Sequence, residues 1–211
     1  MQSGKFITIE GPDGAGKTTV IKKLVEKLTA RGMIELFVTR EPGGSAISEQ
    51  IREVILDVNN TAMDARTEAL LYAAARRQHL VEKIIPALEA GKLVICDRFI
   101  DSSLAYQGIA RNIPTDEIWA INRFAIQDYL PDLTLLIDVP AEVGLKRIYA
   151  AKDNRQFDRL DQEGLAFHNM VRQAFLSFEK EEERMILIDG TQDIDTVVDD
   201  CIQVLETHKM I

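Results

Sequence analysis

The stretch GPDGAGKT, from Gly11 to Thr18, constrains this chain most, because it matches the phosphate-binding pattern G-x-x-x-x-G-K-[ST] at every position. A β-branched run at 6–10 precedes it, and an apolar segment with helical spacing at 19–25 follows it. In such a strand, loop and helix, backbone N–H groups and the helix N-terminus bind phosphate oxygens, while Lys17 reaches the β- and γ-phosphates and the Thr18 hydroxyl ligates Mg²⁺. A glycine-rich turn that matched by chance would lack this context. The sequence therefore predicts a nucleotide site at this loop.

Composition narrows the class of protein. With 211 residues, 46% of them hydrophobic and 28% charged, the chain suits a single domain, 1–211, with one sizeable core. A net charge of −9 works against binding a nucleic acid or an acidic membrane surface. Two cysteines, Cys96 and Cys201, are too few for a disulfide framework, and we expect Cys96 to be a core thiol. Because no apolar run has membrane-spanning length and the start is not signal-like, we expect a cytoplasmic protein.

Apolar runs that alternate with helical patterns predict an α/β fold. Strands are expected at 6–10, 34–39, 93–97, 133–138 and 185–189. Helices are expected after the phosphate pattern up to Gly32 and at 45–56, 64–90, 101–107, 115–125, 141–151, 161–184 and from 194 onward. The longest of these should kink or restart at Pro86. This alternation predicts three layers, with a five-stranded parallel sheet, helices on both faces and ligands at the carboxyl ends of the strands.

Four of the five expected strands end in residues suited to ligand binding, and only the strand at 133–138 ends plainly. The first leads into the phosphate pattern, and the others lead into REPGG, DRF and DGTQ, at 40–44, 97–99 and 189–192. Asp97 has the position of the acidic residue that takes Mg²⁺, usually through water, in phosphate-loop enzymes, although it could simply cap a helix. The guanidinium group of Arg98 can bind two phosphate oxygens at once, and the alternative role for this residue is a structural salt bridge.

The helix expected at 64–90 carries an aromatic ring and a cation on one face. Tyr72 and Arg76 are four residues apart, and His79 continues nearly the same line. Such a pair can sandwich and hydrogen-bond a planar base, although packing plus a solvated charge explains the spacing equally well. The same two readings apply, again at helical spacing, to Ser103, Tyr106 and Gln107.

The stretch 152–161 is charged and nearly free of apolar residues, which indicates a lid at about 151–160 or a plain surface loop. It carries Lys152, Arg155 and Arg159, and Arg147 lies on the preceding helix. Phosphoryl transfer needs cations around the developing charge and the exclusion of water, and a closing lid rich in arginine would provide both. Within the phosphate loop, Asp13 stands where some kinases have an arginine, so the lid would have to supply that charge.

Together these motifs resemble the bacterial type of thymidylate kinase, among the P-loop nucleoside monophosphate kinases. The resemblance covers essentially the whole chain and rests on GPDGAGKTT, TREPGG, RTEALLYAA, DRFIDSSLAYQG and RLDQE, at 11–19, 39–44, 66–74, 97–108 and 159–163. The fourth of these motifs is the most specific. The resemblance implies a P-loop kinase fold with a short lid, phosphorylation of dTMP to dTDP by MgATP for dTTP synthesis, and a homodimer.

The resemblance also implies a role for each matching position. The ATP site would comprise Gly11, Pro12, Asp13, Gly14, Ala15, Gly16, Lys17, Thr18, Thr19, Arg147, Gly190 and Thr191. The dTMP site would comprise Arg40, Glu41, Pro42, Arg52, Tyr72, Arg76, Arg98, Ser103, Tyr106 and Gln107. The residues that act in catalysis would be Asp13, Lys17, Arg98 and Arg155, and the Mg²⁺ site would be formed by Thr18 and Asp97.

Within the implied dTMP site, Arg98 would hold the phosphate, with Arg40 and Arg52 as further candidates. Tyr72 would stack on thymine, Arg76 would donate to the base, and the N3 edge would be read by Gln107 or Ser103. Tyr106 would crowd the 2′ position and so favour deoxyribose, and Asp13 would contact the 3′-hydroxyl or the Mg²⁺ shell. Arg155 would stabilise the transition state from the lid, with Arg147 and Arg159 as further candidates for the same role. The chain departs from the commonest family pattern, without losing a charge or a metal ligand, at Ser48, Tyr72 and Ala75.

Two other functions compete with this interpretation. A kinase for another nucleotide, or for a deoxynucleoside, would need a different acceptor pocket. A GTP-dependent switch protein would need an Asn/Thr-Lys-x-Asp guanine reader, which the sequence does not contain. Asp161 to Gly164 fits the D-x-x-G motif of such proteins, but it lies in an acidic stretch expected to be helical rather than after a strand.

Overall fold

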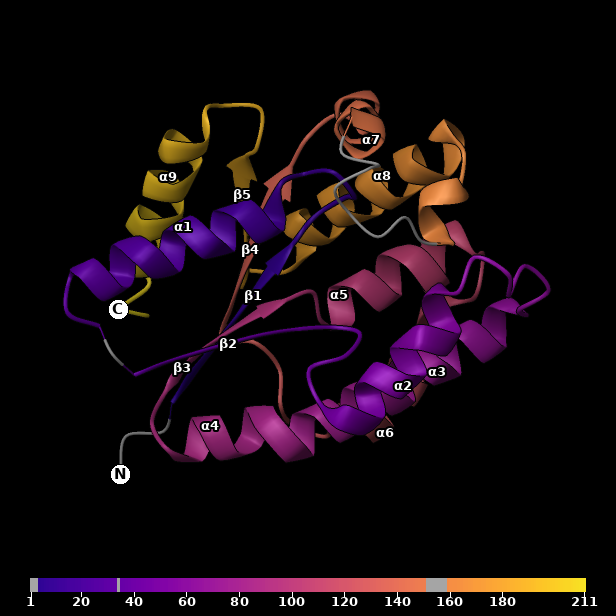
Figure 1. The fold of residues 1–211 in the computed structure, drawn as a ribbon, viewed down its shortest axis with the longest axis horizontal. Coiled ribbons are helices and arrows are strands. Elements are labelled where there is room, and N and C mark those ends of the chain that lie inside the picture. Colours follow the sequence, from indigo (N-terminus) through magenta and orange to yellow (C-terminus); the bar gives the residue numbers. More distant parts are fainter. Residues whose placement is uncertain (1–3, 34, 151–158) are drawn as a thin grey trace.

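A five-stranded parallel sheet forms the centre of the protein (Figure 1). The computed structural model describes residues 4–33, 35–150 and 159–211. The strands run in the order β2-β3-β1-β4-β5 and are β1 (Lys5–Glu10), β2 (Leu36–Arg40), β3 (Leu93–Asp97), β4 (Leu133–Asp138) and β5 (Met185–Asp189). The predicted α/β class and the five strands are therefore confirmed, with strand ends that shift by one or two residues.

The helices alternate with the strands as the sequence predicts. Within the described residues they are α1 (Lys17–Ala30), α2 (Ala46–Leu56), α3 (Ala65–His79), α4 (Ile85–Glu89), α5 (Ile100–Ser103), α6 (Thr115–Ile126), α7 (Ala141–Ala150), α8 (Leu165–Glu181) and α9 (Ile194–Thr207). Two π-helical stretches and one 3₁₀ turn join them, namely η1 (Leu80–Ile84), η2 (Leu104–Ala110) and η3 (Leu160–Gln162). None of these helices is long and apolar enough to cross a membrane.

Two helix boundaries differ from the sequence pattern in an informative way. The helix expected at 64–90 is interrupted by η1 just before Pro86, which agrees with the predicted kink. The helix expected at 161–184 is shorter, because Gly164 is extended and α8 begins only after it. The D-x-x-G stretch therefore lies in the 3₁₀ turn and loop before α8, and the prediction that it is part of a long helix is wrong.

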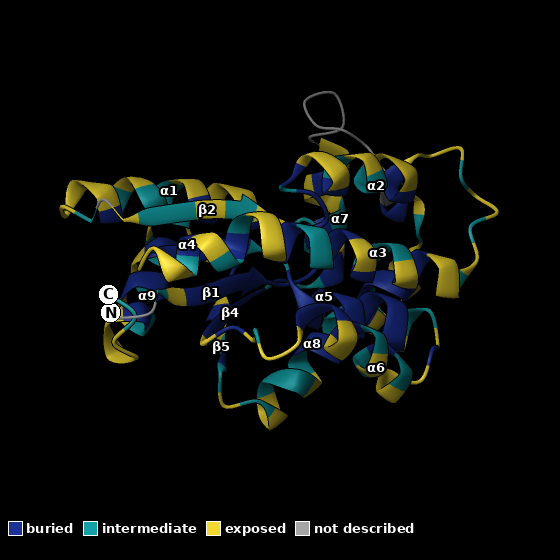
Figure 2. Ribbon diagram, turned by 90° about the horizontal axis from the view of Figure 1, so that it is seen from below, coloured by how far each residue is buried: buried dark blue, intermediate teal, exposed yellow. Residues whose placement is uncertain are grey.

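Alternate side chains of the strands build two hydrophobic layers. On β1, Ile7 and Ile9 pack in a cluster with residues of α1 and α9. Phe6 points to the other face, where it packs with residues of α3 to α6. Figure 2 shows β1 and β4 buried between the helices, and Figure 1 shows α1 and α9 together on one face of the sheet. The unalternating apolar runs are thus explained by burial on both faces.

The phosphate loop lies at the middle of the carboxyl edge of the sheet, because β1 has β3 on one side and β4 on the other. This is the point where the order of the strands reverses, and open α/β sheets bind ligands there. Gly14 has a φ of +74°, and a Cβ at this residue would meet the backbone oxygen of Gly144 at 2.2 Å. The loop is therefore packed directly against α7, and no larger residue fits at Gly14.

Candidate active site

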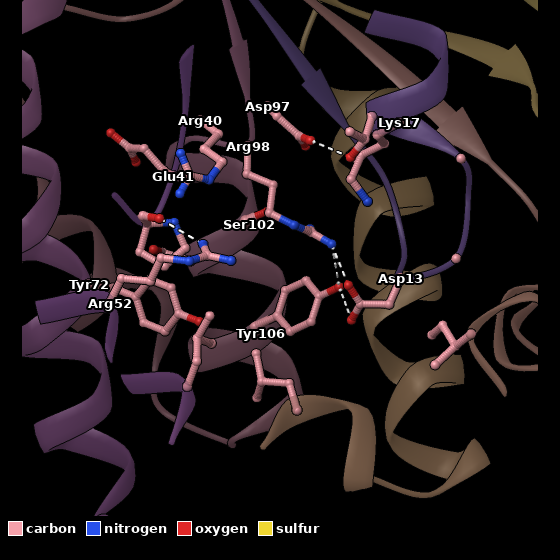
Figure 3. A pocket seen from close by; sticks show the side chains of 18 of the residues that line it. Asp13, Lys17, Arg40, Glu41, Arg52, Tyr72, Asp97, Arg98, Ser102 and Tyr106 are labelled. Atoms are coloured by element: carbon pink, nitrogen blue, oxygen red, sulfur yellow. Dashed lines mark hydrogen bonds and ion pairs between the residues drawn. The ribbon is translucent and has the colours of Figure 1, made fainter. Parts of the chain in front are cut away.

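A cleft of about 710 Å³ opens at the carboxyl edge of the sheet (Figure 3). The predicted site residues that line it are Asp13, Gly14, Gly16, Lys17, Thr18, Thr19, Arg40, Glu41, Pro42, Arg52, Tyr72, Arg76, Asp97, Arg98, Ser103, Tyr106, Gln107 and Arg147. The structure thus gathers the ends of three strands and one face of α3 around a single space. Lining residues that the sequence analysis did not single out are Leu56, Ser102, Ile148 and Leu160.

Five predicted residues of the ATP side do not line this cleft, namely Gly11, Pro12, Ala15, Gly190 and Thr191. The first three belong to the phosphate loop itself, and Gly190 and Thr191 follow β5. Arg155 and most of the predicted lid lie outside the described residues. Only Arg159 and Leu160 of that segment can be placed.

Lys17 is folded back onto its own loop. Its Nζ donates to the carbonyl oxygens of Gly11, at 3.0 Å, and Pro12, at 2.9 Å. Burial, together with the nearby cation of Arg98, lowers the pKa of Lys17 to about 8. The ammonium group is therefore held at the mouth of the phosphate loop, in a setting that an anionic ligand would stabilise.

Thr18 and Asp97 meet as the sequence predicts. The Thr18 hydroxyl donates to Asp97 Oδ2 at 3.2 Å, although the two residues are 79 positions apart. The other carboxylate oxygen, Oδ1, is buried and receives no hydrogen bond from the described residues. A hydroxyl and an open carboxylate oxygen suit Mg²⁺, which prefers oxygen ligands and keeps several waters. The described residues contain no cluster of three His, Cys, Asp or Glu that could hold a metal alone, so phosphate oxygens would have to complete the site.

Arg98 reaches across the cleft to the phosphate loop (Figure 3). Its Nη1 donates to Gly11 O at 3.1 Å and to Ser102 Oγ at 2.9 Å. Its Nη2 donates to Asp13 Oδ1 at 2.5 Å and to Tyr106 Oη at 3.2 Å. Tyr106 in turn donates to Asp13 Oδ2 at 2.8 Å, with its ring 5.1 Å from the guanidinium carbon. The predicted residues Asp13, Arg98 and Tyr106 therefore form one hydrogen-bonded cluster.

The electrostatics of this cluster keep Asp13 ionised. Burial alone would raise the pKa of its carboxyl group, but the cations of Arg98 and Lys17 outweigh burial and lower that pKa. Burial raises the pKa of Tyr106 well above its usual value, so its hydroxyl stays protonated and can donate. The cleft thus contains a carboxylate between two cations at the end where phosphates are expected.

Arg76 is buried, with 2% of its surface exposed, and it lies at the floor of the cleft. Its Nε donates to Glu41 Oε2 at 2.7 Å, and Nη1 donates to Ser103 Oγ at 2.9 Å and to Asn122. Nη2 donates to the carbonyl oxygen of Phe99 at 2.9 Å. The alternative of a solvated charge on α3 is therefore wrong, because Arg76 is fixed by four protein acceptors.

His79, which continues the helical spacing of Tyr72 and Arg76, and Gln107, a member of the implied dTMP site, both have partners within the protein. His79 is fully buried and bonds to Thr39 at 2.6 Å and to Glu41 at 3.1 Å, and it does not line the cleft. His79 thus continues the line of Tyr72 and Arg76 along the chain but contacts Thr39 and Glu41 instead of the cleft. Gln107 lines the cleft and donates to Glu68 Oε1 at 2.7 Å.

The arginines at the rim are also held by protein acceptors. Arg52 donates to the carbonyl oxygen of Pro42 at 2.7 Å, and Arg40 pairs with Glu49 at 3.0 Å. These contacts fix the REPGG segment against α2. Both arginines still line the cleft on the side of Tyr72 (Figure 3).

Arg159 and Arg147 have different surroundings. Arg159 is buried, pairs with Glu68 and donates to the carbonyl oxygen of Ile55 at 3.1 Å, so it anchors its segment instead of lining the cleft. Arg147 donates to Gly14 O and Ala15 O, both at 3.4 Å, and to Gly190 O at 3.3 Å. Of the two, only Arg147 lies against the phosphate loop.

Sequence reasoning missed three buried polar residues around the site. Glu10 is fully buried behind Arg98, Glu68 receives Gln107, and Asn122 receives Arg76. Glu10 could have been noticed, since it ends the apolar strand that leads directly into the phosphate pattern. Glu68 and Asn122 have no local signal, because their partners lie 39 and 46 positions away.

A phosphate loop after the first strand, together with an aspartate and an arginine after the neighbouring strand, defines the class of P-loop phosphotransferases. Comparisons with known proteins give the family. The model of the thymidylate kinase family matches residues 9–201. The chain belongs to the thymidylate kinase family.

Individual relatives agree over nearly their whole length. The thymidylate kinase of Latilactobacillus sakei is 59% identical over 203 residues, which are 96% of this chain and 94% of that protein. The thymidylate kinase of Clostridium novyi is 57% identical over 201 residues, covering 95% and 97%. The crystal structure of thymidylate kinase from Ehrlichia chaffeensis superposes with a TM-score of 0.77 at 35% identity, covering 97% of this chain and 99% of that one.

Proposed function

We propose that this chain phosphorylates dTMP to dTDP with ATP, and that both nucleotides bind in the cleft described above. The observation that carries the proposal is the shared carbonyl of Gly11. It accepts Nζ of Lys17 at 3.0 Å and Nη1 of Arg98 at 3.1 Å, so the cation of the donor side and the cation of the acceptor side meet at one point. A phosphoryl group passed between two phosphates needs positive charge at that point.

On the donor side, the phosphate loop binds the β- and γ-phosphates through its N–H groups and Lys17. Thr18 and Asp97 would hold Mg²⁺, which supplies charge neutralisation on the phosphates when it is bound. The open, buried Oδ1 of Asp97 supports this assignment. Gly190 and Thr191 lie near adenine, and the contact of Arg147 with Gly190 O supports placing them on the ATP side.

On the acceptor side, Arg98 holds the phosphate of dTMP, and Arg76 with Ser103 or Gln107 contacts the polar edge of thymine. The four partners that fix Arg76 support this role, because a side chain already held in one orientation loses little conformational entropy when the ligand binds. Tyr72 stacks on the base. Asp13 and Tyr106 close the sugar end, where their mutual hydrogen bond limits the space at the 2′ position.

The reaction is an in-line attack of a dTMP phosphate oxygen on the γ-phosphorus of ATP, with ADP as the leaving group. No covalent enzyme intermediate is needed, because the acceptor oxygen is already anionic and catalysis consists of positioning and charge stabilisation. Arg155 would add positive charge from the lid. Asp13 replaces the arginine that some kinases carry in this loop, which supports a charge supplied from elsewhere.

We also propose that the protein is a single-domain, cytoplasmic homodimer. Phe124, on α6, is 85% exposed, and Leu70, on α3, is 56% exposed, although both are large and apolar. Helices α3 and α6 pack against each other, so a second copy could cover both side chains at once. Size-exclusion chromatography with light scattering tests this, and a monomer at micromolar concentration would contradict it.

An ADP-release assay with a panel of acceptors tests the reaction. We expect turnover with dTMP, much weaker turnover with other nucleoside monophosphates, and none with thymidine. Preference for a nucleoside would indicate a deoxynucleoside kinase. Tight GTP binding without acceptor-dependent turnover would indicate a switch protein and would refute the proposal.

A further inference from the structure

A buried carboxylate lies directly behind Arg98. Glu10 ends β1, is fully buried, and faces the turn that follows β3. Its Oε1 accepts the backbone N–H of Phe99 at 2.7 Å and that of Ser102 at 3.3 Å. Its Oε2 accepts the hydroxyl of Ser102 at 2.6 Å. Glu10 therefore binds the start of α5 at three points without itself lining the cleft.

The Ser102 hydroxyl connects Glu10 to Arg98. A serine hydroxyl has one proton and two lone pairs, and an ionised carboxylate can only accept. Above its pKa of about 7, where Glu10 is ionised, the proton of Ser102 therefore points to Glu10, which leaves a lone pair for Nη1 of Arg98 at 2.9 Å. The carboxylate thus sets the direction in which Ser102 accepts, and so it sets the orientation of the guanidinium group.

Glu10 also stabilises the backbone turn that carries Arg98. Arg98 has a φ of +68°, in the left-handed region that a non-glycine residue enters only when its surroundings enforce it. The N–H of Arg98 donates to Ile9 O at 3.0 Å, and the next N–H, that of Phe99, donates to Glu10. Two successive residues of β1 therefore hold this turn, which aims the side chain of Arg98 back at the phosphate loop.

We propose that Glu10 is a positioning residue for phosphoryl transfer, which orients Arg98 toward the acceptor phosphate through Ser102 and through the turn at Arg98. This inference rests on the proposed role of Arg98 in binding dTMP. It also explains why an acidic residue is buried at this point of the sheet, since a neutral side chain would offer the turn fewer acceptors.

The charges around Glu10 agree with such a role. Asp101, on α5, is held by both Nη atoms of Arg184 at 2.7 and 2.9 Å, and its charge raises the pKa of Glu10. Arg98 and Lys17 attract the carboxylate from the cleft side. Glu10 therefore interacts both with a carboxylate that is paired with Arg184 and with the cations of Arg98 and Lys17, which line the cleft.

Steady-state kinetics of Glu10→Gln, Ser102→Ala and the double variant test the proposal, with dTMP and ATP varied separately. Each single change should lower kcat/KM for dTMP by about 10- to 100-fold and leave KM for ATP within about twofold. Because both changes break one path, the double variant should be no more than about threefold worse than the worse single variant. If the losses of kcat/KM in the two single variants multiply in the double variant, Glu10 and Ser102 act independently and the proposal is refuted.

Two further variants separate this proposal from its alternatives. Thr8→Val removes a buried hydrogen bond to Thr134, of 2.8 Å, from the same face of β1. Thr134 still accepts from Arg184, and the contacts of Glu10 with Phe99 and Ser102 remain, so this variant should leave both KM values unchanged. Arg98→Ala tests the proposed function, and normal dTMP kinetics in this variant would refute the role of Arg98 itself. If Glu10→Gln does not fold, Ser102→Ala still decides, because wild-type dTMP kinetics there would refute the relay.

Discussion

Replacing Glu10 by Gln should make the stability of the protein less dependent on pH. Burial, with the charge of Asp101 adding to it, raises the pKa of Glu10 from 4.5 to about 7. The folded chain therefore binds this proton more tightly than the unfolded chain does. Its contribution to stability is fully present below pH 4.5 and is lost as the pH rises through 7. At 1.36 kcal/mol for each pKa unit, the loss is about 3 kcal/mol.

Chemical denaturation at pH 5 and at pH 8 measures this effect. Between these values the wild type should lose roughly 2 to 3 kcal/mol of unfolding free energy relative to Glu10→Gln, because glutamine has no proton to release. The other groups are present in both proteins, and among the groups that respond to the charge of Glu10 is Lys17, so the difference between the two proteins reports Glu10 together with its coupling to Lys17. Thr8→Val, with its unchanged carboxylate, should follow the wild type. Parallel pH profiles for the wild type and Glu10→Gln would refute the reasoning.

Three other changes have defined outcomes. Lys17→Ala should abolish turnover with an unchanged circular dichroism spectrum, and near-normal ADP release would refute the role of the phosphate loop. Arg155→Ala should lower kcat by up to about 10³-fold with little change in dTMP affinity. Arg159→Ala should instead cost about 3 kcal/mol of unfolding free energy, because it leaves the buried Glu68 without its closest cation. If Arg159→Ala lowers kcat without loss of stability, Arg159 and not Arg155 is the catalytic arginine. Tyr106→Ala should narrow the preference for dTMP over its ribose counterpart, and an unchanged ratio of kcat/KM would contradict steric exclusion.

The sequence predicted those features whose physical cause is local. The phosphate loop is one contiguous strand, turn and helix, so its pattern specifies its shape and its charge. The buried strands are equally predictable from the sequence, because a strand covered on both faces needs an unbroken apolar run such as 93–96. The alternation of strands and helices then limits the fold to a parallel sheet. The pairing of Asp97 with the loop also follows, since the carboxyl ends of neighbouring strands meet at one edge.

Helix ends and the partners of charged side chains were less predictable. Gly164 ends the extended segment before α8, yet the charged residues around it have ordinary helical propensity. His79 has the helical spacing of Tyr72 and Arg76, but it is buried in hydrogen bonds with Thr39 and Glu41, which belong to another part of the chain. Propensity and spacing describe one element at a time, whereas these outcomes depend on which other element packs against it.

The sequence alone therefore determined the nucleotide loop, the strand pattern and the identity of most residues that line the cleft. Only the tertiary structure decided how those residues are held. Glu10 meets Phe99 and Ser102 across 89 and 92 positions, and Glu68 meets Arg159 across 91. A buried charge is tolerated only where the fold supplies its partners, and those partners come from segments that no local pattern connects.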